Sequence, residues 1–425
     1  MNKDTTLVWQ LKRDLLNFAE KLSDGLTKPM MKFLAQMLYG LLVSQSIMLT
    51  DIGRALQEVT TLKKVVDRLS RNLKAFRREI ESVRQNYIET IKPLVDEETI
   101  FCIDPGDITK RYSRHQDGLG WIYDGSDHKP ALGWHLYEVT ALTHGEKLPI
   151  PVYSQLVSPN DLISEGQTEE ILDAIRATQR LFGTIGVHTM DRGMDNEAIY
   201  EHYFDTNQRF VIRSKVDRRL IAGDETIQTA EIAAKMKGKY RIDCKDKHGK
   251  IYRLKVSFQT VFLPSYPDKP LTLVIIYGYD KDAPMLLMTN LSIKGKQTCL
   301  RVVKTYLCRW RIEECYRFQK NQFDLENIRV LSEDSICALV FLVSVLTGYI
   351  AAFAAKRGKS LLLEEVFIKA DRVYGIVQFT LYAVADGIFN ILKRATKGIR
   401  FALLHTPQSQ QLSLFKPSDF NIDAA

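Results

Sequence analysis

The sequence predicts a mixed α/β protein in which helical regions flank a strand-rich middle. The first 95 residues contain only two prolines, Pro29 and Pro93, and have helical character throughout. Short apolar runs bounded by turn residues begin near residue 99 and recur as far as residue 293. No proline or glycine occurs from Lys296 to Phe323, and further helical segments follow. A chain of 425 residues is long enough for several such regions around a sizeable core.

Composition and charge are those of a soluble globular protein with a basic excess. Hydrophobic residues make up 45% of the chain and charged residues 26%. The net charge of +8 favours a polyanionic partner, although ribosomal, membrane-surface and merely basic proteins share it. Residues 1–95 hold 16 Lys and Arg against 10 Asp and Glu, a difference of +6. The helical N-terminal region therefore carries most of the excess charge.

The cysteines and the apolar segments indicate a cytoplasmic protein. The six cysteines form no CxxC pair and have no histidines suitably placed for zinc, so free thiols in a reducing cytosol are expected. The N-terminus is too polar for a signal peptide. Ser335 to Ala355 carries no charge and has the length of a membrane span. Its Ser, Thr, Gly and Tyr residues favour a buried helix crossing the back of a sheet, so no membrane partner is expected.

A helix-turn-helix is predicted between Leu49 and Lys74. Gly53 lies early in this stretch, and Thr60 or Thr61 can cap a second helix. A helix-turn-helix places its second helix in the major groove of DNA. The candidate DNA-binding residues of that helix are basic: Lys63, Lys64, Arg68 and Arg71. The alternative is a plain helical bundle with a solvated basic face.

The next segment predicts strands that end in carboxylates. Residues 99–104, TIFCID, form a β-prone run that stops at Pro105-Gly106, which places Asp104 at its carboxyl end; Asp107 is the rival candidate. Residues 134–142 and 148–157 read as a hairpin, residues 168–182 as a helix, and residues 185–191 as a strand ending in Asp191. This order is that of a ribonuclease H-like core. Asp104 could instead form a turn, and Asp191 could cap a helix at 196–204.

A strand-rich interval of 122 positions separates Asp191 from Glu313. Its predicted strands are 209–216, 240–244, 251–263, 271–279 and 285–293, with a turn at 245–250. The core alone needs far fewer residues to bring its last helix into place. The interval is therefore interpreted as a β-rich insertion.

The helix predicted around residues 306–320 combines polar and apolar faces. At about 100° per residue, Tyr306, Arg309, Glu313 and Lys320 fall within roughly 60° of one another. The neighbouring face is a candidate core stripe: Leu300, Val303, Leu307, Trp310 and Phe318. The polar residues thus border a buried surface. The alternative is a surface helix whose Arg309 and Glu313 form an ordinary i,i+4 pair worth about 0.3 to 0.5 kcal/mol.

The spacing of these four polar residues resembles the signature of the insertion-sequence-four family of DDE transposases. The pattern is Tyr, two residues, Arg, three residues, Glu, six residues, Lys, and it is present at all four positions. The sequences I-D-P-G-D and M-D-R-G-M-D look like the motifs around that family's two catalytic aspartates. The resemblance implies that Asp104, Asp191 and Glu313 are catalytic and bind two Mg²⁺ or Mn²⁺ ions. Such ions prefer carboxylate oxygens.

The resemblance also implies roles for the rest of the chain. Tyr306, Arg309 and Lys320 would bind DNA. The enzyme would cleave the terminal inverted repeats of an insertion sequence and join the 3′ ends to target DNA, acting as a homodimer in the bacterial cytoplasm and associated there with the nucleoid. The expected regions are a DNA-binding domain (1–95), the two parts of the core (96–204 and 296–358), the insertion (205–295) and a helical C-terminal region with a polar tail (359–425).

Two other functions stay open on the sequence, and one expected residue is missing. The protein could be an inactive DNA-binding regulator derived from such an element, or a metal-dependent nuclease that cuts without joining. In certain relatives a Trp of the insertion receives a base flipped from the duplex. Here no Trp occurs between Trp134 and Trp310, so a Tyr or Phe would have to take that role.

Overall fold

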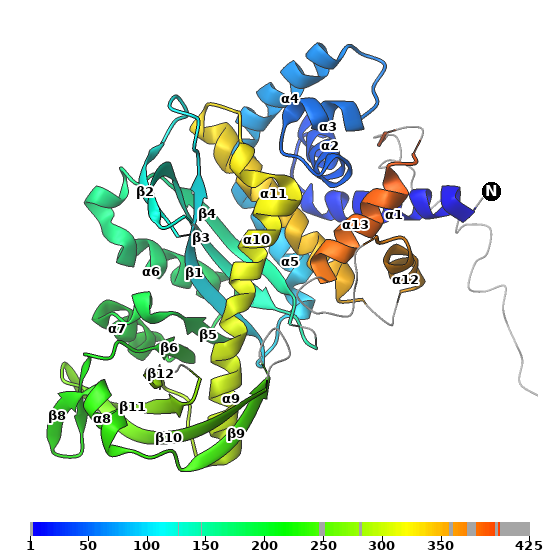
Figure 1. The fold of residues 1–425 in the computed structure, drawn as a ribbon. Coiled ribbons are helices and arrows are strands. Elements are labelled where there is room, and N and C mark those ends of the chain that lie inside the picture. Colours follow the sequence, from blue (N-terminus) through cyan, green and yellow to red (C-terminus); the bar gives the residue numbers. More distant parts are fainter. Residues whose placement is uncertain are drawn as a thin grey trace, which may run out of the picture.

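A computed structural model describes most of the chain: residues 3–125, 127–145, 147–245, 251–279, 283–356, 360–371, 380–395 and 398–399. The fold is mixed α/β, as predicted. A large sheet runs through the molecule, with a helical body on one side and a strand-rich region at the opposite end (Figure 1). The predicted polar tail after residue 400 lies outside the described residues.

The described strands form one twelve-stranded sheet. Its order is β2-β3-β1-β5-β6-β12-β11-β10-β7-β8, with β4 paired to β3 and β9 paired to β10. The strands are β1 (Ile100–Thr109), β2 (Gly120–Asp124), β3 (Lys129–Leu142), β4 (Pro149–Val157), β5 (Val187–Met190), β6 (Phe210–Arg213), β7 (Arg219–Ala222), β8 (Glu225–Gln228), β9 (Tyr240–Lys245), β10 (Ile251–Leu263), β11 (Tyr266–Tyr277) and β12 (Met285–Thr289). The predicted turn at 245–250 falls almost wholly outside the described residues, but β9 and β10 pair antiparallel on either side of it.

The parallel part of the sheet is short and brings the two aspartates to the same edge. β1 runs parallel to β5 only from Ile100 to Ile103, with Ile103 opposite Met190. β5 in turn runs parallel to β6. Asp104 and Asp191 are the next residues along their strands, and the carboxyl ends of parallel strands share one edge of a sheet. The two aspartates are therefore brought together as predicted, although only Asp191 follows the end of its strand.

The prediction that the first strand stops at Pro105-Gly106 is wrong. β1 continues to Thr109, and Pro105 lies opposite Tyr137 of β3. Beyond Ile103 the other edge of β1 has no partner strand among the described residues, so a residue without an N–H is tolerated there. Asp104 thus lies in the middle of a strand, at the point where parallel pairing ends.

Helices cover both faces of this part of the sheet. On one face Phe101 packs against Phe182 of α6 (Leu162–Phe182), with ring centroids 5.4 Å apart. On the other face Cys102 forms a small cluster with Ile312 of α10 (Arg311–Phe323). Side chains alternate along a strand, so Asp104 lies on the α10 face. α7 (Glu197–Thr206) is capped by the side chain of Asn196, which leaves Asp191 without a capping role there.

The segment predicted as an insertion continues the central sheet. β6 lies in this segment and is the parallel neighbour of β5, so the predicted boundary at 204/205 separates two paired strands. β12, β11 and β10 extend the sheet from β6, and β7, β8 and α8 (Thr229–Lys235) were not predicted. Apolar residues of β9 to β12 pack against α9 (Lys296–Leu307) in a second core. This region is therefore joined to the core through a shared sheet.

The helical body is built from both ends of the chain. Its members are α1 (Lys3–Leu22), α2 (Lys28–Ser44), α3 (Leu49–Ala55), α4 (Leu62–Phe76), α5 (Ile80–Ile91), α11 (Glu333–Ala354), α12 (Leu361–Ile368) and α13 (Thr380–Leu392). Phe76 packs against Phe341, and Phe18 against Tyr349. The Lys12 ammonium donates to the carbonyl oxygen of Gly398. Residues 1–95 and the C-terminal helices therefore share one core.

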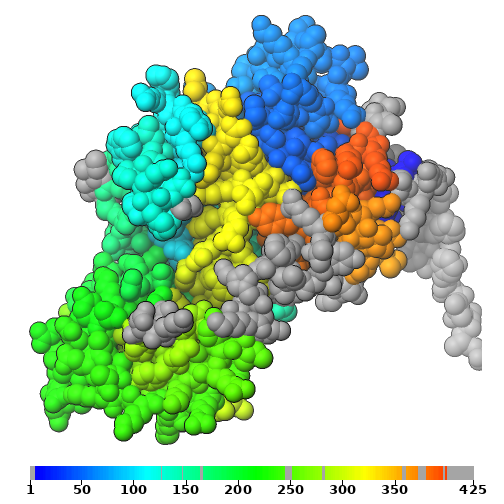
Figure 2. All heavy atoms as spheres, in the orientation of Figure 1, coloured from blue at the N-terminus to red at the C-terminus, as the bar shows by residue number. Residues whose placement is uncertain are grey.

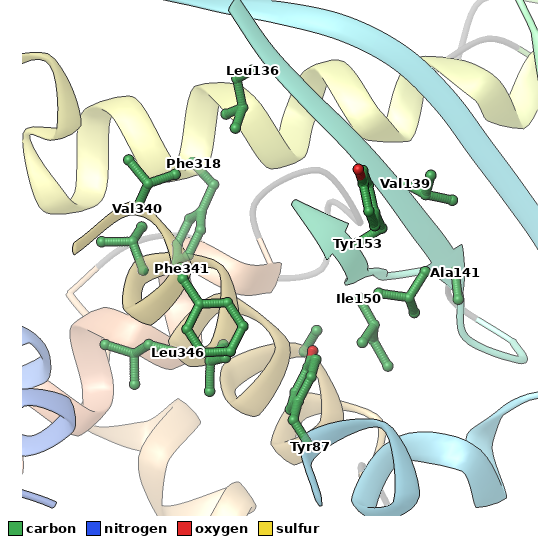
Figure 3. Close-up of a cluster of buried hydrophobic side chains, with 14 of the residues drawn as sticks. Tyr87, Leu136, Val139, Ala141, Ile150, Tyr153, Phe318, Val340, Phe341 and Leu346 are labelled. Carbon is green, nitrogen blue, oxygen red and sulfur yellow. The ribbon is translucent and has the colours of Figure 1, made fainter. Parts of the chain in front are cut away.

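The apolar run near residue 340 is the central helix of this body. α11 is long and apolar enough to cross a membrane, but 89% of its most apolar window is buried within the chain. Figure 3 shows Val340, Phe341 and Leu346 beside Phe318 of α10, with Leu136 of β3 and Tyr87 of α5 nearby. Burial against the sheet and the N-terminal helices explains why the segment carries no charge.

Candidate active site

The signature residues lie on two helices joined by a tight turn. α9 ends at Leu307, a single 3-10 turn spans Cys308–Trp310, and α10 begins at Arg311. One continuous helix was predicted, and the tighter turn changes the direction in which Arg309 points. In the predicted core stripe, Val303 and Phe318 are buried, whereas Leu300, Leu307 and Trp310 are half-buried. Tyr306, predicted on the polar side, is 5% exposed.

Arg309 joins two of the three predicted catalytic acids. Its Nη1 donates to Oδ2 of Asp104, and its Nη2 donates to Oε1 of Glu313 at 2.8 Å. The arginine side chain is 13% exposed and that of Asp104 20%, so this ion pair is largely removed from water. Glu313 is more open, at 47%. A planar guanidinium presents a separate nitrogen to each carboxylate, a geometry that the single nitrogen of a lysine cannot reproduce.

Tyr306 binds the third acid. Its hydroxyl donates to Oδ1 of Asp191 at 2.9 Å. Burial raises the pKa of Tyr306 to about 12, and the charge of Asp191 adds to this effect, so the phenol stays protonated and remains a donor. Burial alone would raise the pKa of the Asp191 carboxyl. The charge of Arg309, the backbone N–H of Arg192 and the Tyr306 hydroxyl outweigh burial and lower it.

The cluster has more negative than positive charge. Burial raises the pKa of Asp104 to about 7; Arg309 opposes this shift, and the charges of Asp191 and Glu313 reinforce it. Burial disfavours the charged guanidinium, but the carboxylates of Asp104 and Asp191 raise the pKa of Arg309 above its ordinary value. When ionised, the three carboxylates outnumber the nearby cations, because among the described residues only Arg309 and, at Asp191, Arg213 act on them. The site therefore has the charge to accept further cations.

Tyr316 attaches α10 to the strand that carries Asp104. Its hydroxyl donates to the backbone carbonyl oxygens of Asp104 and Leu136. A Cβ on Gly106 would lie 2.9 Å from the Tyr316 ring, so the glycine leaves room for the ring against the sheet. The interaction fixes the height of α10 above β1. Sequence reasoning missed this residue, although the glycine next to the aspartate motif was a signal for a close approach.

A buried polar network lies beneath α10 and was also missed. Glu138 of β3 lies opposite Asp104 and is 1% exposed. Gln319 of α10 donates to Glu138 Oε2 at 3.0 Å, and Ser344 of α11 donates to the same oxygen at 3.2 Å. Burial raises the pKa of Glu138 to about 7. This carboxyl thus links the sheet to both helices that cover it.

The structure separates Asp107 and Lys320 from the acidic cluster. Lys320 Nζ lies 3.0 Å from Asp107 Oδ2 and 3.0 Å from Glu326 Oε1. Burial lowers the pKa of Lys320, but these two carboxylates outweigh burial and raise it. The ammonium therefore stays charged. Of the two rival aspartates, Asp104 is the one held with Glu313. Lys320 of the predicted quartet is occupied by two ion pairs in this structure.

The second aspartate motif contains another buried acid. Asp195 is fully buried and lies 2.6 Å from Arg218 Nε. It also accepts hydrogen bonds from Tyr200 Oη at 2.7 Å and from the backbone N of Lys215 at 2.7 Å. These contacts tie the residues after β5 to those after β6. Asp195 is thereby fully engaged in holding the fold around Asp191.

The N-terminal basic residues lie on the helical body. α3 and α4 are consecutive helices joined by Leu56 to Thr61. Lys63, Lys64 and Arg71 on α4 are exposed. Arg68 instead lies 2.6 Å from Glu58 Oε1 and also donates to Gln36, so this predicted DNA contact is part of an internal ion pair.

The three acids have the chemistry of a divalent metal site. They offer hard carboxylate oxygens at a place with a formal excess of negative charge, which suits Mg²⁺ or Mn²⁺. Within the described part of the chain, no three His, Cys, Asp or Glu side chains are grouped closely enough to hold an ion as they stand. Arg309 binds Asp104 and Glu313 together in this arrangement. The three carboxylates therefore fit a divalent metal ion, and in this structure the Arg309 guanidinium supplies the positive charge beside them.

An α/β sheet with two aspartates at one edge and a glutamate on the covering helix is the framework of a DNA-cleaving enzyme. Residues 96–347 match the family model described as "Transposase DDE domain". This match covers more than half of the chain and includes Asp104, Asp191 and Glu313. The chain belongs to the family of transposases with this DDE domain.

The chain is also similar to a solved structure of a transposase. It is the "Cryo-EM structure of piggyBac transposase synaptic complex with hairpin DNA", with a TM-score of 0.44 and 10% sequence identity. The alignment covers 100% of this chain and 87% of that one. No curated protein matches the sequence of this chain.

Proposed function

We propose that this transposase binds the terminal inverted repeats of an insertion sequence, cleaves them and joins the 3′ ends to target DNA. One observation carries the proposal: Arg309 holds Asp104 and Glu313 together while Tyr306 holds Asp191. Residues from β1, from the end of β5 and from the helices α9 and α10 with the turn between them thus meet in one charged cluster, across 205 positions in the case of Asp104 and Arg309. The Tyr-Arg-Glu-Lys pattern supports assignment to the insertion-sequence-four branch of the family.

The strand order supports a ribonuclease H-like core. β4, β3, β1, β5 and β6 lie side by side in that order, antiparallel on one side of β1 and parallel on the other. α6 and α10 lie on opposite faces. Under this proposal the core extends through β6, and the inserted strands are β7 to β12.

Two Mg²⁺ or Mn²⁺ ions would be held by Asp104, Asp191 and Glu313. When bound, such ions activate the attacking oxygen and stabilise the leaving oxygen of a phosphodiester. In the first reaction the oxygen of water attacks phosphorus and a 3′-hydroxyl leaves; in the second, that 3′-hydroxyl attacks a target phosphodiester and displaces another. The same carboxylates serve both reactions because the bonds formed and broken are of the same kind.

The chain's own residues position and balance this chemistry. Tyr306 orients Asp191 through its hydroxyl, and Tyr316 holds the backbone of Asp104. Arg309 binds two carboxylates and offsets part of their charge in the absence of other cations. Its guanidinium can then turn to a phosphate of the DNA, which it binds with the same planar fork. Lys320 can reach DNA after exchanging an ion pair with Asp107 or Glu326 for a phosphate.

The remaining assignments concern partners and place of action. α3 and α4 serve as the helix-turn-helix that reads the repeats, with Lys63, Lys64 and Arg71 facing outward. Two transposon ends must be held together during joining, so a homodimer forms in the DNA complex. The six free cysteines among the described residues suit the reducing bacterial cytoplasm, where the protein acts at the nucleoid.

Single substitutions in the acidic cluster test the proposal. Asp104→Asn, Asp191→Asn and Glu313→Gln should each abolish Mg²⁺-dependent cleavage of a labelled inverted-repeat duplex and leave gel-shift affinity within about twofold. Asp107→Asn is the matched control, because it removes an acid on the same strand outside the cluster. Full cleavage by any of the three variants would remove that residue from the site.

Two other functions are separated by further assays. An inactive regulator would bind repeats and show no metal-dependent nicking in the wild-type protein. A nuclease without joining activity would cleave the repeats and fail to insert precleaved 3′ ends into a plasmid. The occurrence of all three acids with Arg309 and Tyr306 favours the complete reaction, because a DNA binder has no use for them together.

A further inference from the structure

Exposed aromatic side chains are concentrated in one small part of the chain. Four aromatic residues are well exposed among the described residues, and three of them lie within twelve positions: Tyr112 at 99%, Trp121 at 71% and Tyr123 at 62%. None of these three side chains has a hydrogen bond or ring contact to another described residue. The fourth, Trp9, is 45% exposed and lies under the Arg13 guanidinium on α1. Contacts within the chain therefore do not explain why three exposed aromatic side chains lie so close together in sequence.

Trp121 and Tyr123 lie on the open face of a two-stranded ribbon formed by β2 and residues 129–133 of β3. On its other face Ile122 and Asp124 are 5% and 3% exposed. A Cβ on Gly120 would lie 2.9 Å from Pro159. The ribbon is thus packed by one face, and its two large aromatic side chains stand on the free face.

The free face of the ribbon is the same sheet face that carries Asp104. On β3, Glu138 lies opposite Asp104 and Leu132 lies opposite Trp121. Positions 138 and 132 are an even number of residues apart, and paired residues share a face, so all four side chains are on one side. The six residues from 138 to 132 span about 20 Å. That distance corresponds to about six nucleotides of duplex from the acidic cluster.

Three exposed cations lie on the loop that follows β1 and on the ribbon itself. Arg111 and Arg114 are exposed on the loop that follows β1, on either side of Tyr112. Arg111 and Lys129 share the single carboxylate of Asp127, at 2.8 and 3.1 Å. Residues 111–129 also contain Asp117 and Asp124, so the segment is formally neutral as a whole. Asp124 lies on the packed face of the ribbon, which leaves three cations against two acids among the exposed residues. Figure 2 shows this cyan segment on the outside of the molecule beside the yellow helix α11.

We propose that this surface, formed by Trp121 and Tyr123 with the loop Arg111 to Arg114, binds unpaired nucleotides of the DNA on which the enzyme acts. The proposal rests on the proposed function for the identity of the DNA. Two side chains at i and i+2 of a strand are about 6.6 Å apart, twice the 3.4 Å between stacked bases, so one base fits between the two rings. In a closed duplex the base faces are covered, and only an unpaired base can stack on a side chain.

Binding of short DNA to the full-length protein tests this assignment. Fluorescence anisotropy would be recorded with a labelled thymine 15-mer and with a 15-bp duplex. Trp121→Ala and Tyr123→Ala should each weaken single-strand binding roughly 5- to 150-fold, the range for one stacked base, and change duplex binding less than twofold. Trp121→Phe should restore most of the affinity, because stacking needs a ring and no particular donor. Trp9→Ala is the matched control and should bind as the wild type.

Several outcomes would overturn the proposal. Unchanged single-strand affinity in Trp121→Ala would remove the ring from the site, and an equal loss for both DNA forms would show a general effect of charge or folding. If the DNA-free Trp121→Ala protein sedimented differently from the DNA-free wild type, the face would bind a second copy of the chain. Arg111→Ala and Arg114→Ala should each reduce the slope of log affinity against log salt for the single strand by about 0.7.

The test is independent of catalysis. If Trp121→Ala binds normally while Asp104→Asn fails to cleave, the surface assignment fails and the proposed function stands. If Trp121→Ala loses single-strand binding while the wild type cleaves no inverted repeat, the surface stands and the proposed function fails.

Discussion

Two helices, α10 and α11, cover the same face of the sheet by different means. α11 buries an uncharged run of Val, Leu, Ile and Phe side chains against β4 and the N-terminal helices. α10 meets the sheet with Tyr316 and Gln319, which bond to the backbone of Asp104 and to Glu138, while Arg309 just before it pairs with Asp104. Apolar packing has no alternative partner and fixes α11 in place. The partners of an ion pair can instead be exchanged for other ions. The same sheet therefore supports α11, held by apolar packing, beside the acidic cluster under α10, held by ion pairs.

The largest effect on the cleavage rate is expected from replacing Arg309, the cation of the acidic cluster. Arg309→Ala should lower the cleavage rate by at least about 10²- to 10³-fold, as does loss of a charge-stabilising donor in other active sites. Arg309→Lys should recover part of that loss, because an ammonium supplies charge without the planar fork. Cleavage of a repeat duplex and urea unfolding would be measured on the same samples. A rate for Arg309→Ala close to that of the wild type would show that the guanidinium only balances charge.

Substitutions in α11 should lower the stability of the protein and leave its cleavage rate unchanged. Leu346→Ala in α11 removes a fully buried side chain and should lower the free energy of unfolding by about 3 to 5 kcal/mol. The cleavage rate per folded molecule should stay within about twofold of the wild type. Leu361→Ala, at an exposed position of α12, is the control and should leave the unfolding midpoint unchanged. A large loss of rate in folded Leu346→Ala protein would show that the packing of α11 and the acidic cluster are coupled.

Glu138 contacts both α10 and α11 and should make the stability of the protein depend on pH. Its pKa is raised from 4.5 to about 7 by burial, so it stabilises the fold fully below about pH 4.5 and this contribution is lost as the pH rises through 7. The corresponding loss is about 3 kcal/mol. Glu138→Gln should reduce the fall in unfolding free energy between pH 5 and pH 8 by that amount.

Asp104 must be separated from this effect, because its pKa is raised to about 7 as well and gives the same sign. Asp104→Asn measured alone and combined with Glu138→Gln would apportion the two contributions. An unchanged pH profile in Glu138→Gln would show that the pKa of this carboxyl is the same in the folded and the unfolded chain.

The smallest effect is expected where α10 touches the strand. Gly106→Ala places a Cβ 2.9 Å from the Tyr316 ring, which must move outward by a few tenths of an ångström. We expect a cost of about 1 to 2 kcal/mol and a roughly tenfold slower cleavage. In Gly106→Ala/Tyr316→Phe, which removes the hydroxyl but keeps the ring, the rate should fall no further if the ring contact alone is responsible.

Much of the site could be predicted because its residues occur in a recognisable spacing. The residue types and intervals at Tyr306, Arg309 and Glu313 predicted a cluster with two upstream aspartates, and Asp104 and Asp191 do follow the paired ends of β1 and β5. Which aspartate of the first motif belongs to the cluster was open. It is decided by contacts between β1 and α10 that arise from positions about 200 residues apart, which local patterns do not encode.

The errors have physical causes of the same kind. Pro105-Gly106 has the sequence of a turn, but β3 pairs with that stretch and keeps it extended. β6 resembles the strands after it, and only its parallel pairing with β5 places it in the core. Lys320 shares a helix face with Glu313 in an ideal helix, yet acids at Asp107 and Glu326 hold it away from the cluster. Pairing partners, rather than propensity, decided each case.

The shared core of the two chain ends has a consequence for the synthesis of the protein. α4 packs on α11, and Gln57 donates to the carbonyl oxygen of Ala395, so the first five helices cannot bury their apolar faces until the last ones exist. Roughly 300 residues separate Leu94 from Leu392, and translation at about 5 to 20 residues per second takes about 15 to 60 s to cover them. The helical body is thus completed last, when the central sheet has already left the ribosome, and under the proposed function a nascent or truncated chain has no finished DNA-binding unit.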